Sequence, residues 1–257
     1  MEHASVVGGR VAWVTGASSG IGEALSLGLA RAGWSVAASA RRADRLAAVA
    51  ARPEAGGRIH PFAVDVTDEP AVRAVAAAIE ERLGPIEAAV LNAGDYTPMP
   101  ARELDTALCR HLMEVNYLGV VNGIAAVLGR QLARRSGRIL INASVAGYRG
   151  LPGAAPYGAS KAAIINLAES LRAELQGSGV TIRVINPGFV RTPLTAKNDF
   201  AMPALIDAQS AAERILRDFD GEGFEITFPK RFTYLMKLLR CLPYRWYFPL
   251  LRARTGR

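Results

Sequence analysis

The stretch TGASSGIG, residues 15–22, joins the apolar run RVAWVT (10–15) to the helical pattern EALSLGLARAG (23–33). Its glycines suit a strand-to-helix turn: Gly16 can make the tight turn, Gly20 admits a bound group and Gly22 lets the helix pack. The positive end of the following helix would then meet a pyrophosphate. The spacing G-x-x-x-G-x-G differs from the commoner G-x-G-x-x-G, and such turns also occur in ordinary loops, so the stretch alone leaves its function open.

The same alternation of apolar run and helical pattern continues along the chain. Runs of this kind, which lack a polar face, are typical of parallel strands buried on both sides and separated by helices. They are WSVAASA (34–40), RIHPFAV (58–64), IEAAVLN (86–92), RILINAS (138–144), TIRVINP (181–187) and FEITFP (224–229). We therefore predict one doubly wound α/β domain over residues 1–229.

Composition and charge restrict the class of protein. Half of the 257 residues are hydrophobic, which is enough for a sizeable core. Residues 1–229 contain 23 basic and 23 acidic side chains, whereas residues 230–257 contain 8 basic and no acidic ones, so the tail carries the whole net charge of +8. Because a groove-binding domain should carry its basic stripe on the folded body, we do not expect nucleic acid as a partner.

The chain shows no targeting or metal-binding pattern. The N-terminus has an acid at position 2 and only a short apolar run, so no signal peptide is expected. No run offers the roughly 18 uncharged apolar residues of a spanning helix. Cys109 and Cys241 are far apart and the three histidines are scattered, so neither a disulfide nor a metal is expected. These features favour a cytoplasmic protein.

Tyr157 and Lys161 in YGASK (157–161) are one helical turn apart. Such i,i+4 pairs are common on helix surfaces, where Tyr packs and Lys extends into water, so the spacing alone is ambiguous. An ammonium fixed about 4 Å from the phenol would lower the pKa of Tyr157 by a few units from its usual value of about 10. That shift would make Tyr157 a proton exchanger near neutral pH.

Seven motifs in order decide between these interpretations. They are TGASSGIG, Asp65–Val66, NAG (92–94), Asn116 in MEVNYLG, Ser144 in NASVAG, YGASK and PGFVRT (187–192). In these motifs the chain resembles the short-chain dehydrogenase/reductase family over about residues 10–230. The resemblance implies a Rossmann fold with a seven-stranded parallel sheet in the order 3-2-1-4-5-6-7, and reversible hydride transfer between a nicotinamide and an alcohol or carbonyl.

The resemblance also implies a role for each matching residue. Tyr157 would be the general acid and base, Ser144 would hold the developing oxyanion, and Lys161 would lower the pKa of Tyr157 and hold the nicotinamide ribose. Asn116 would position a water that links Lys161 to solvent, or would be a helix-kinking residue satisfied by backbone. Further residues implied to bind the cofactor are Gly16, Ser18, Ser19, Gly20, Ile21, Gly22, Asp65, Val66, Asn92, Ala93, Gly94, Pro187, Gly188, Val190 and Thr192.

The residues after the second predicted strand favour NADP(H) over NAD(H). By alignment with the family, Ala40 stands where an acid would bind the ribose hydroxyls of NAD, and Arg41 and Arg42 follow it. A guanidinium matches phosphate oxygens in a fork and can lie on the adenine ring. The alternative is that both arginines only begin a solvated helix.

In the family, the segment after PGFVRT forms a mobile substrate lid, here about residues 193–210. Its apolar side chains and those of neighbouring loops predict an apolar or amphipathic substrate, although ordinary loop packing would explain them equally well. The predicted substrate contacts are Met99, Ser144, Tyr148, Leu151, Leu194, Phe200 and Met202.

Three functions remain open at this point: an NADP(H)-dependent oxidoreductase, a dehydratase or epimerase of the same family, and a catalytically silent cofactor-binding protein. The family assembles through its fourth and fifth helices, so a homodimer or tetramer is expected.

Residues 230–257, KRFTYLMKLLRCLPYRWYFPLLRARTGR, lie beyond the family's common core. On a helix, Phe232, Leu235, Met236, Leu239 and Leu242 fall on one face and Lys230, Lys237 and Arg240 on the other, until Pro243 ends the pattern. A basic amphipathic segment with Trp and Tyr suits the surface of an anionic membrane. Its apolar face could instead dock on the protein itself or on a second subunit. Both alternatives stay open, and a spanning helix is excluded.

Overall fold

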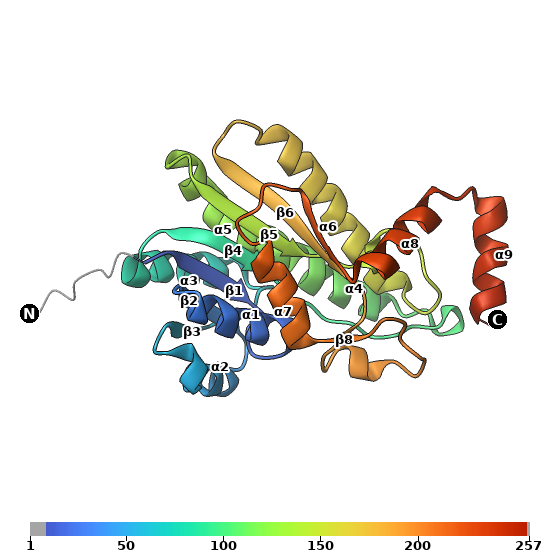
Figure 1. Cartoon of the computed structure of the whole chain (residues 1–257), viewed down its shortest axis with the longest axis horizontal. Helices are drawn as coiled ribbons and strands as arrows, with labels where there is room; N and C mark the ends of the chain where they lie inside the picture. The colour runs from blue at the N-terminus through green and yellow to red at the C-terminus, as the bar shows by residue number, and fades with distance from the viewer. Residues whose placement is uncertain (1–8, 256–257) are drawn as a thin grey trace, which may run out of the picture.

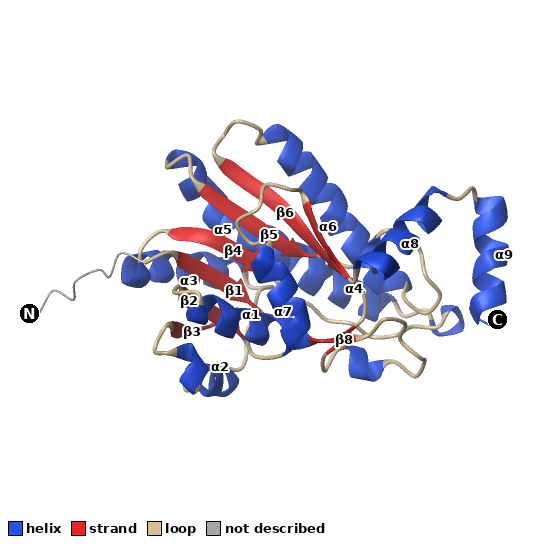
Figure 2. Cartoon of the chain, viewed as in Figure 1, coloured by secondary structure: helices blue, strands red, loops and turns tan. Residues whose placement is uncertain are grey.

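Helices cover both faces of the central sheet, which is why its strands are mostly apolar (Figure 2). The structure, a computed structural model, describes residues 9–255, with side chains through Arg252; residues 1–8 of the predicted domain and 256–257 of the tail lie outside it. Seven parallel strands have the order β3-β2-β1-β4-β5-β6-β9. They are β1 (Val11–Thr15), β2 (Ser35–Ala40), β3 (Ile59–Ala63), β4 (Ile86–Leu91), β5 (Gly137–Asn142), β6 (Val180–Pro187) and β9 (Glu225–Phe228).

The predicted sheet is therefore confirmed in strand number, direction and order. The seventh strand is β9 because β7 (Val190–Arg191) and β8 (Ile206–Asp207) pair with each other outside the main sheet. The helices are α1 (Gly20–Arg31), α2 (Ala43–Ala50), α3 (Glu69–Leu83), α4 (Thr106–Met113), α5 (Gly119–Ala133), α6 (Ala155–Glu174), α7 (Ala208–Arg217), α8 (Lys230–Cys241) and α9 (Tyr244–Thr255). Short turns are η1 (Pro53–Ala55), η2 (Ala101–Glu103), η3 (Glu114–Leu118), η4 (Val145–Gly147) and η5 (Thr195–Lys197).

Successive residues of a strand enter opposite cores. In β1, Ala12 and Val14 pack with α1, α2 and α7, whereas Val11 and Trp13 pack with α3, α5 and α6. All four side chains are 2% exposed or less. Since side chains alternate along a strand, a strand covered on both faces is apolar at most positions on both sides.

α4, η3 and α5 form one long apolar helix. Among the described residues, Thr106–Ala133 is one stretch that is long and apolar enough to cross a membrane, and an 18-residue window within it has a mean hydropathy of 1.4. Its side chains Val120, Ile124 and Val127 are buried between the helix and the sheet. This packing explains the apolar composition as that of a core helix.

The tail continues the chain after β9 as two helices at the end of the molecule toward which β5 and β6 run (Figure 1). α8 ends at Cys241, as predicted from Pro243, and a second helix, α9, follows it with Pro249 inside. Met236 and Thr233 face inward, but Leu235 is 39% exposed. The predicted apolar face is thus only partly covered by the catalytic domain.

Candidate active site

The turn TGASSGIG lies between β1 and α1, where close backbone contacts explain its glycines. Gly16 and Gly20 have φ values of 68° and 58°, a region that L side chains rarely adopt. A Cβ on Gly22 would overlap the carbonyl oxygen of Gly16 and lie 2.5 Å from Asn92 Nδ2. The turn therefore holds α1 against the ends of β1 and β4.

We expect Gly22→Ala to lower the free energy of unfolding by about 1–3 kcal/mol, because the added methyl group must displace backbone. The same displacement should weaken NADPH binding. The matched control is Gly129→Ala on α5, where an added Cβ meets nothing within 4 Å. Urea unfolding and cofactor titration of both variants test this expectation, and equal stability of the two would contradict it.

The first turn of α1 is open to an anion. The side chain of Ser19 caps none of its amides, whereas Asp68, Asp105 and Asp207 cap α3, α4 and α7. Uncapped amides at the positive end of a helix bind phosphate groups well. The donor set of this turn therefore fits the pyrophosphate of a dinucleotide.

Two cations lie beside this turn at the end of β2. Arg42 Nη2 is 3.5 Å from Ser18 Oγ, and Arg41 is exposed and close enough to Asp65 to help lower the pKa of that carboxyl. Asp65 also accepts hydrogen bonds from the amide and the hydroxyl of Thr67. With Ala40 in place of an acid, this corner is suited to an additional phosphate.

A hydrogen-bonded chain links the carboxyl ends of three neighbouring strands. The amides of Asn92 and Ala93 donate to Thr15 Oγ1 over 2.9 and 3.1 Å, and Asn142 Nδ2 donates to Asn92 Oδ1 over 2.9 Å. Lys161 Nζ donates to the carbonyl oxygen of Asn142 over 2.8 Å. The NAG motif thus connects the glycine turn to the lysine of YGASK.

The fold brings the four predicted catalytic residues together. Lys161 Nζ lies 5.7 Å from the centre of the Tyr157 ring, and the Ser144 side chain hydrogen-bonds that of Tyr157. A Cβ on Gly94 would be 3.0 Å from Asn116 Oδ1 and 3.5 Å from Lys161 Nζ, so these groups are neighbours. Residues from α6, η3 and the loop after β5 therefore form one cluster.

Burial determines the protonation of the Tyr157–Lys161 pair in the protein alone. It raises the pKa of Tyr157 to about 12, against the lowering effect of the Ser144 hydrogen bond, and lowers the pKa of Lys161 to about 8. The sequence-based expectation of a lowered Tyr157 pKa is wrong for this state. Lys161 is itself desolvated, and the loss of water around the phenol is the largest effect on the pKa of Tyr157.

Asn116 lies in the π turn η3 and is fully buried. Its Oδ1 accepts from the Asp95 amide over 2.8 Å, and its Nδ2 donates to Asp95 O and Ser160 Oγ, each over 3.0 Å. The Asn116 side chain thus has hydrogen-bond partners in the backbone and in α6, which agrees with its alternative interpretation as a helix-kinking residue satisfied by backbone. The π turn interrupts the helix ladder at the same place, and such turns often mark functional sites.

The predicted nicotinamide-side loop follows β6. Gly188 lies against the tail, since a Cβ there would be 2.8 Å from Phe232 Cδ1, and Val190 is buried. Thr192 faces the glycine turn: its Cγ2 would be 3.0 Å from a Cβ on Gly20. The two proposed cofactor loops therefore face each other.

The predicted substrate residues occupy different environments. Met99 and Tyr148 are buried, and the phenol of Tyr148 donates to the carboxylate of Glu225 beneath α8. Leu151 packs against the same cluster. On the lid, Leu194 and Met202 are half-buried and Phe200 is 50% exposed. The lid residues, Ser144 and Leu151 thus present partly open side chains, and the contact roles of all seven stay predictions.

Four residues at this site were missed from the sequence. The Tyr96 ring lies edge-on to Tyr157 at 4.9 Å, and its hydroxyl donates to Asn198 Oδ1 over 2.7 Å. Lys197 Nζ donates to Asp95 Oδ1 over 3.1 Å. These hydrogen bonds join Lys197 and Asn198 of the predicted lid to Asp95 and Tyr96, which follow the NAG motif. The position of Asp95 and Tyr96 directly after Gly94 was the available signal.

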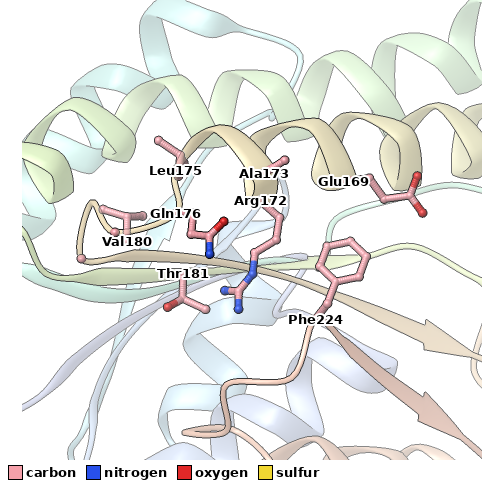
Figure 3. A pocket seen from close by; sticks show the side chains of 10 residues that line it. Glu169, Arg172, Ala173, Leu175, Gln176, Val180, Thr181 and Phe224 are labelled. Carbon is pink, nitrogen blue, oxygen red and sulfur yellow. The ribbon is translucent and has the colours of Figure 1, made fainter.

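A separate hollow of about 600 Å³ lies between the end of α6, Val180 and Phe224 (Figure 3). Val180 begins β6 and Phe224 precedes β9, so this hollow is at the amino ends of the strands. The Tyr157 cluster follows their carboxyl ends, where ligands bind in open α/β sheets. We assign the hollow no part in the chemistry.

Comparison with known proteins agrees with this architecture. The short chain dehydrogenase family model matches residues 10–202. An uncharacterized oxidoreductase of Myxococcus xanthus is 37% identical over 235 residues, covering 91% of this chain and 93% of the relative.

Two solved structures are also similar to this chain. A short-chain dehydrogenase/reductase from Burkholderia phymatum, in complex with NAD, has a TM-score of 0.82 at 25% identity, covering 90% of this chain and 92% of that one. A short-chain dehydrogenase from Sphingobium yanoikuyae, in complex with NADPH, has a TM-score of 0.78 at 27% identity, with 96% and 94% covered. With the family model matched over most of its length, this chain belongs to the short-chain dehydrogenase/reductase family of nicotinamide-dependent oxidoreductases.

Proposed function

We propose that this protein is an NADP(H)-dependent oxidoreductase that interconverts an apolar or amphipathic alcohol and its carbonyl compound. The observation that carries the proposal is the cluster of Tyr157, Ser144 and Lys161 at the strand ends that also hold the uncapped turn of α1. When bound, a nicotinamide cofactor supplies or accepts the hydride.

The chain's own residues would hold and move the proton. In carbonyl reduction, the phenol of Tyr157 gives its proton to the substrate oxygen as the carbon is reduced. The hydroxyl of Ser144 donates a hydrogen bond to the same oxygen, where negative charge develops. Lys161 replaces the proton that Tyr157 gives up, and Asn116 and its π turn lie beside Lys161, where a water could connect it to solvent.

Cofactor binding would divide between two loops. The amides of Gly20 and Ile21 and the hydroxyls of Ser18 and Ser19 would hold the pyrophosphate, and Thr192 faces them. Arg41 and Arg42 would bind the 2′-phosphate of NADP(H), an assignment that the absence of an acid at Ala40 supports. Related structures contain NAD as well as NADPH, so the preference rests on these side chains.

The pKa of Lys161 predicts how the rate depends on pH. In the protein alone the pKa of Tyr157 is raised to about 12 and that of Lys161 is lowered to about 8, both by burial, and a reduced nicotinamide ring would add no charge beside them. Tyr157 stays protonated throughout the neutral range. Above pH 8, Lys161 loses the proton it would pass on, so kcat/KM for carbonyl reduction should fall with rising pH.

Stopped-flow or steady-state rates between pH 6 and pH 10 check this expectation, with pH values chosen around the pKa of Lys161. For alcohol oxidation, kcat/KM should rise with pH, because deprotonated Lys161 can accept the proton that the substrate gives to Tyr157. Lys161→Met should remove the break near pH 8. A break that persists in this variant would assign it to another group.

Two other functions use the same residues differently. A dehydratase or epimerase would convert its substrate without net consumption of NADPH, and a silent protein would bind cofactor without turnover. Loss of the absorbance band of reduced nicotinamide, measured against a panel of aldehydes and ketones that includes lipid-like members, tests the proposal. Product formation with the band unchanged would favour the first alternative.

Assembly and location stay predictions. We propose a homodimer through α5 and α6, which the exposed Leu118 beside α5 supports. The division into a catalytic domain (1–229) and a tail (230–257), the cytoplasmic location and membrane contact of the tail belong to the same proposal. Sedimentation velocity of the whole chain tests the oligomeric state.

A further inference from the structure

The tail is attached to the catalytic domain by one face. Met236 of α8 packs with Val145 and Ile165, and Lys237 pairs with Glu225. Arg149 donates to the carbonyl oxygens of Leu239, Arg240 and Leu242 over 2.8, 3.1 and 2.6 Å, which satisfies the end of α8. α8 thus docks on its own catalytic domain, which is one of the alternatives predicted for its apolar face.

The attachment of α9 uses the same loop. Tyr247 is 2% exposed and donates to the carbonyl oxygen of Gly150 over 2.6 Å. The Arg149 guanidinium lies 3.8 Å from the centre of the Tyr247 ring and 4.9 Å from that of Tyr244. Both tail helices are therefore held by the loop that follows Ser144.

The tail also leaves large apolar side chains in solvent. Leu238 is 64% exposed and Trp246 is 56% exposed. Seven such side chains lie in the tail: Tyr234, Leu235, Leu238, Tyr244, Trp246, Phe248 and Leu250. In the rest of the described chain there are three, Leu104, Leu118 and Phe200. Such a concentration marks an interaction surface.

The cations of the tail lie among these apolar side chains. Lys230, Arg231, Arg240, Arg245 and Arg252 are exposed, and residues 230–257 contain no acid. The Arg245 guanidinium lies 4.7 Å from the Trp246 ring centre. Basic side chains mixed with Trp and Tyr suit the headgroup region of a membrane.

The charge of this surface decides between possible occupants. A second copy, joined by twofold symmetry, would bring the same patch of cations against itself with no acid from the tail to neutralise them. An anionic bilayer neutralises the cations and accepts the apolar side chains at the same time. We propose that α8 and α9 lie on an anionic lipid surface and hold the active site beside it.

This position would determine the substrate, a step that rests on the proposed oxidoreductase function. Phe232 of α8 lies 5.7 Å from Phe189, which follows Gly188 in the nicotinamide-side loop. Phe189 also lies 5.8 Å from the exposed lid residue Phe200. Aromatic side chains thus run from the tail to the lid. The substrate class is then a carbonyl or alcohol dissolved in lipid.

The tail contains its own optical probe. Trp13 and Trp34 are 0% and 4% exposed, so Trp246 is the tryptophan that contact with lipid would change. The whole chain is mixed with vesicles of phosphatidylcholine, with and without phosphatidylglycerol. We expect a blue shift of tryptophan emission and co-sedimentation with the anionic vesicles, both weakened by salt.

Matched variants separate this surface from the rest of the protein. Arg231→Gln combined with Arg245→Gln should weaken partitioning into anionic vesicles roughly 30-fold, at the usual contribution of each cation. The control is Arg102→Gln, whose side chain is 85% exposed outside the tail.

The apolar side chains of the tail are tested in the same way. Leu238→Ser with Phe248→Ser should also weaken binding to anionic vesicles, whereas Leu104→Ser, at a residue that is 67% exposed outside the tail, should not.

Several outcomes would overturn the proposal. The first is that the tail variants and the control variants bind anionic vesicles equally. The second is that the whole chain does not sediment with anionic vesicles at low salt. The third is that neither the parent protein nor any variant binds vesicles, while the tail variants no longer form the oligomer of the parent protein. The last result would identify a second copy as the occupant. Vesicle binding needs neither cofactor nor substrate, so it stands or fails independently of the proposed chemistry.

The substrate step has its own test. A long-chain aldehyde carried in anionic vesicles is compared with a short, water-soluble aldehyde. The Arg231→Gln/Arg245→Gln variant should lose rate on the first substrate alone. Equal loss on both would contradict delivery from lipid. If the parent protein reduces neither aldehyde, both the proposed function and the lipid-borne substrate are refuted. The vesicle-binding experiment would then still test whether the tail contacts lipid.

Discussion

Tyr157→Phe should lower kcat for carbonyl reduction by about 100- to 10,000-fold, the usual contribution of a positioned acid or base. The substitution removes one hydroxyl and its hydrogen bond with Ser144. The ring keeps its edge contact with Tyr96 at 4.9 Å, so the fold and NADPH affinity should change little. Single-turnover rates with bound NADPH measure the effect on the chemical step.

Tyr117→Phe is the matched control for this variant. Tyr117 lies in the same π turn as Asn116, but it packs against the sheet core. The control should retain the parent rate. A Tyr157→Phe protein that reduces a verified substrate at the parent rate would show that the proton comes from another group.

Arg41→Asp should weaken NADPH binding by about 1.5–3 kcal/mol for each charge-assisted hydrogen bond that it removes, which is roughly 10- to 150-fold in Kd. NADH lacks the 2′-phosphate, so its affinity should stay the same or rise. Arg42→Asp should act in the same direction, since Arg42 reaches Ser18 in the glycine turn. Fluorescence titration with both cofactors measures the two affinities.

Arg45→Asp provides the control for Arg41 and Arg42. Arg45 is exposed on α2, one turn further along the chain. The same charge reversal there should leave the ratio of NADPH to NADH affinity almost unchanged. Comparable affinities for the two cofactors in the parent protein would contradict the assignment of a 2′-phosphate site.

The sheet could be predicted because its physical cause is local. A strand covered on both faces is mostly apolar on both sides, so all seven runs were visible in the sequence. The glycine turn was predictable for a similar reason: Gly16 and Gly20 adopt conformations that few other residues tolerate. The Tyr157–Lys161 pair was visible because i,i+4 spacing places both side chains on one face of a helix.

Features that depend on contacts between distant residues could not be predicted. Tyr96 and Asn198 are 102 residues apart, and Arg149 meets the end of α8 about 90 residues later. The direction of the Tyr157 pKa shift also escaped prediction, because it depends on how deeply the pair is buried. The attachment of α9 is of the same kind, because Tyr247 donates to the carbonyl oxygen of Gly150, 97 residues earlier in the chain.

Deuterium transfer tests the central claim most directly. NADPH carrying deuterium at both positions of C4 of the nicotinamide is incubated with the protein and a panel of long-chain and aromatic aldehydes and ketones, and the alcohol product is analysed by mass spectrometry. The proposed function predicts deuterium on the former carbonyl carbon, at a rate that falls with Tyr157→Phe. A converted substrate whose product carries no deuterium, or bound NADPH that no member of the panel oxidises, would contradict it.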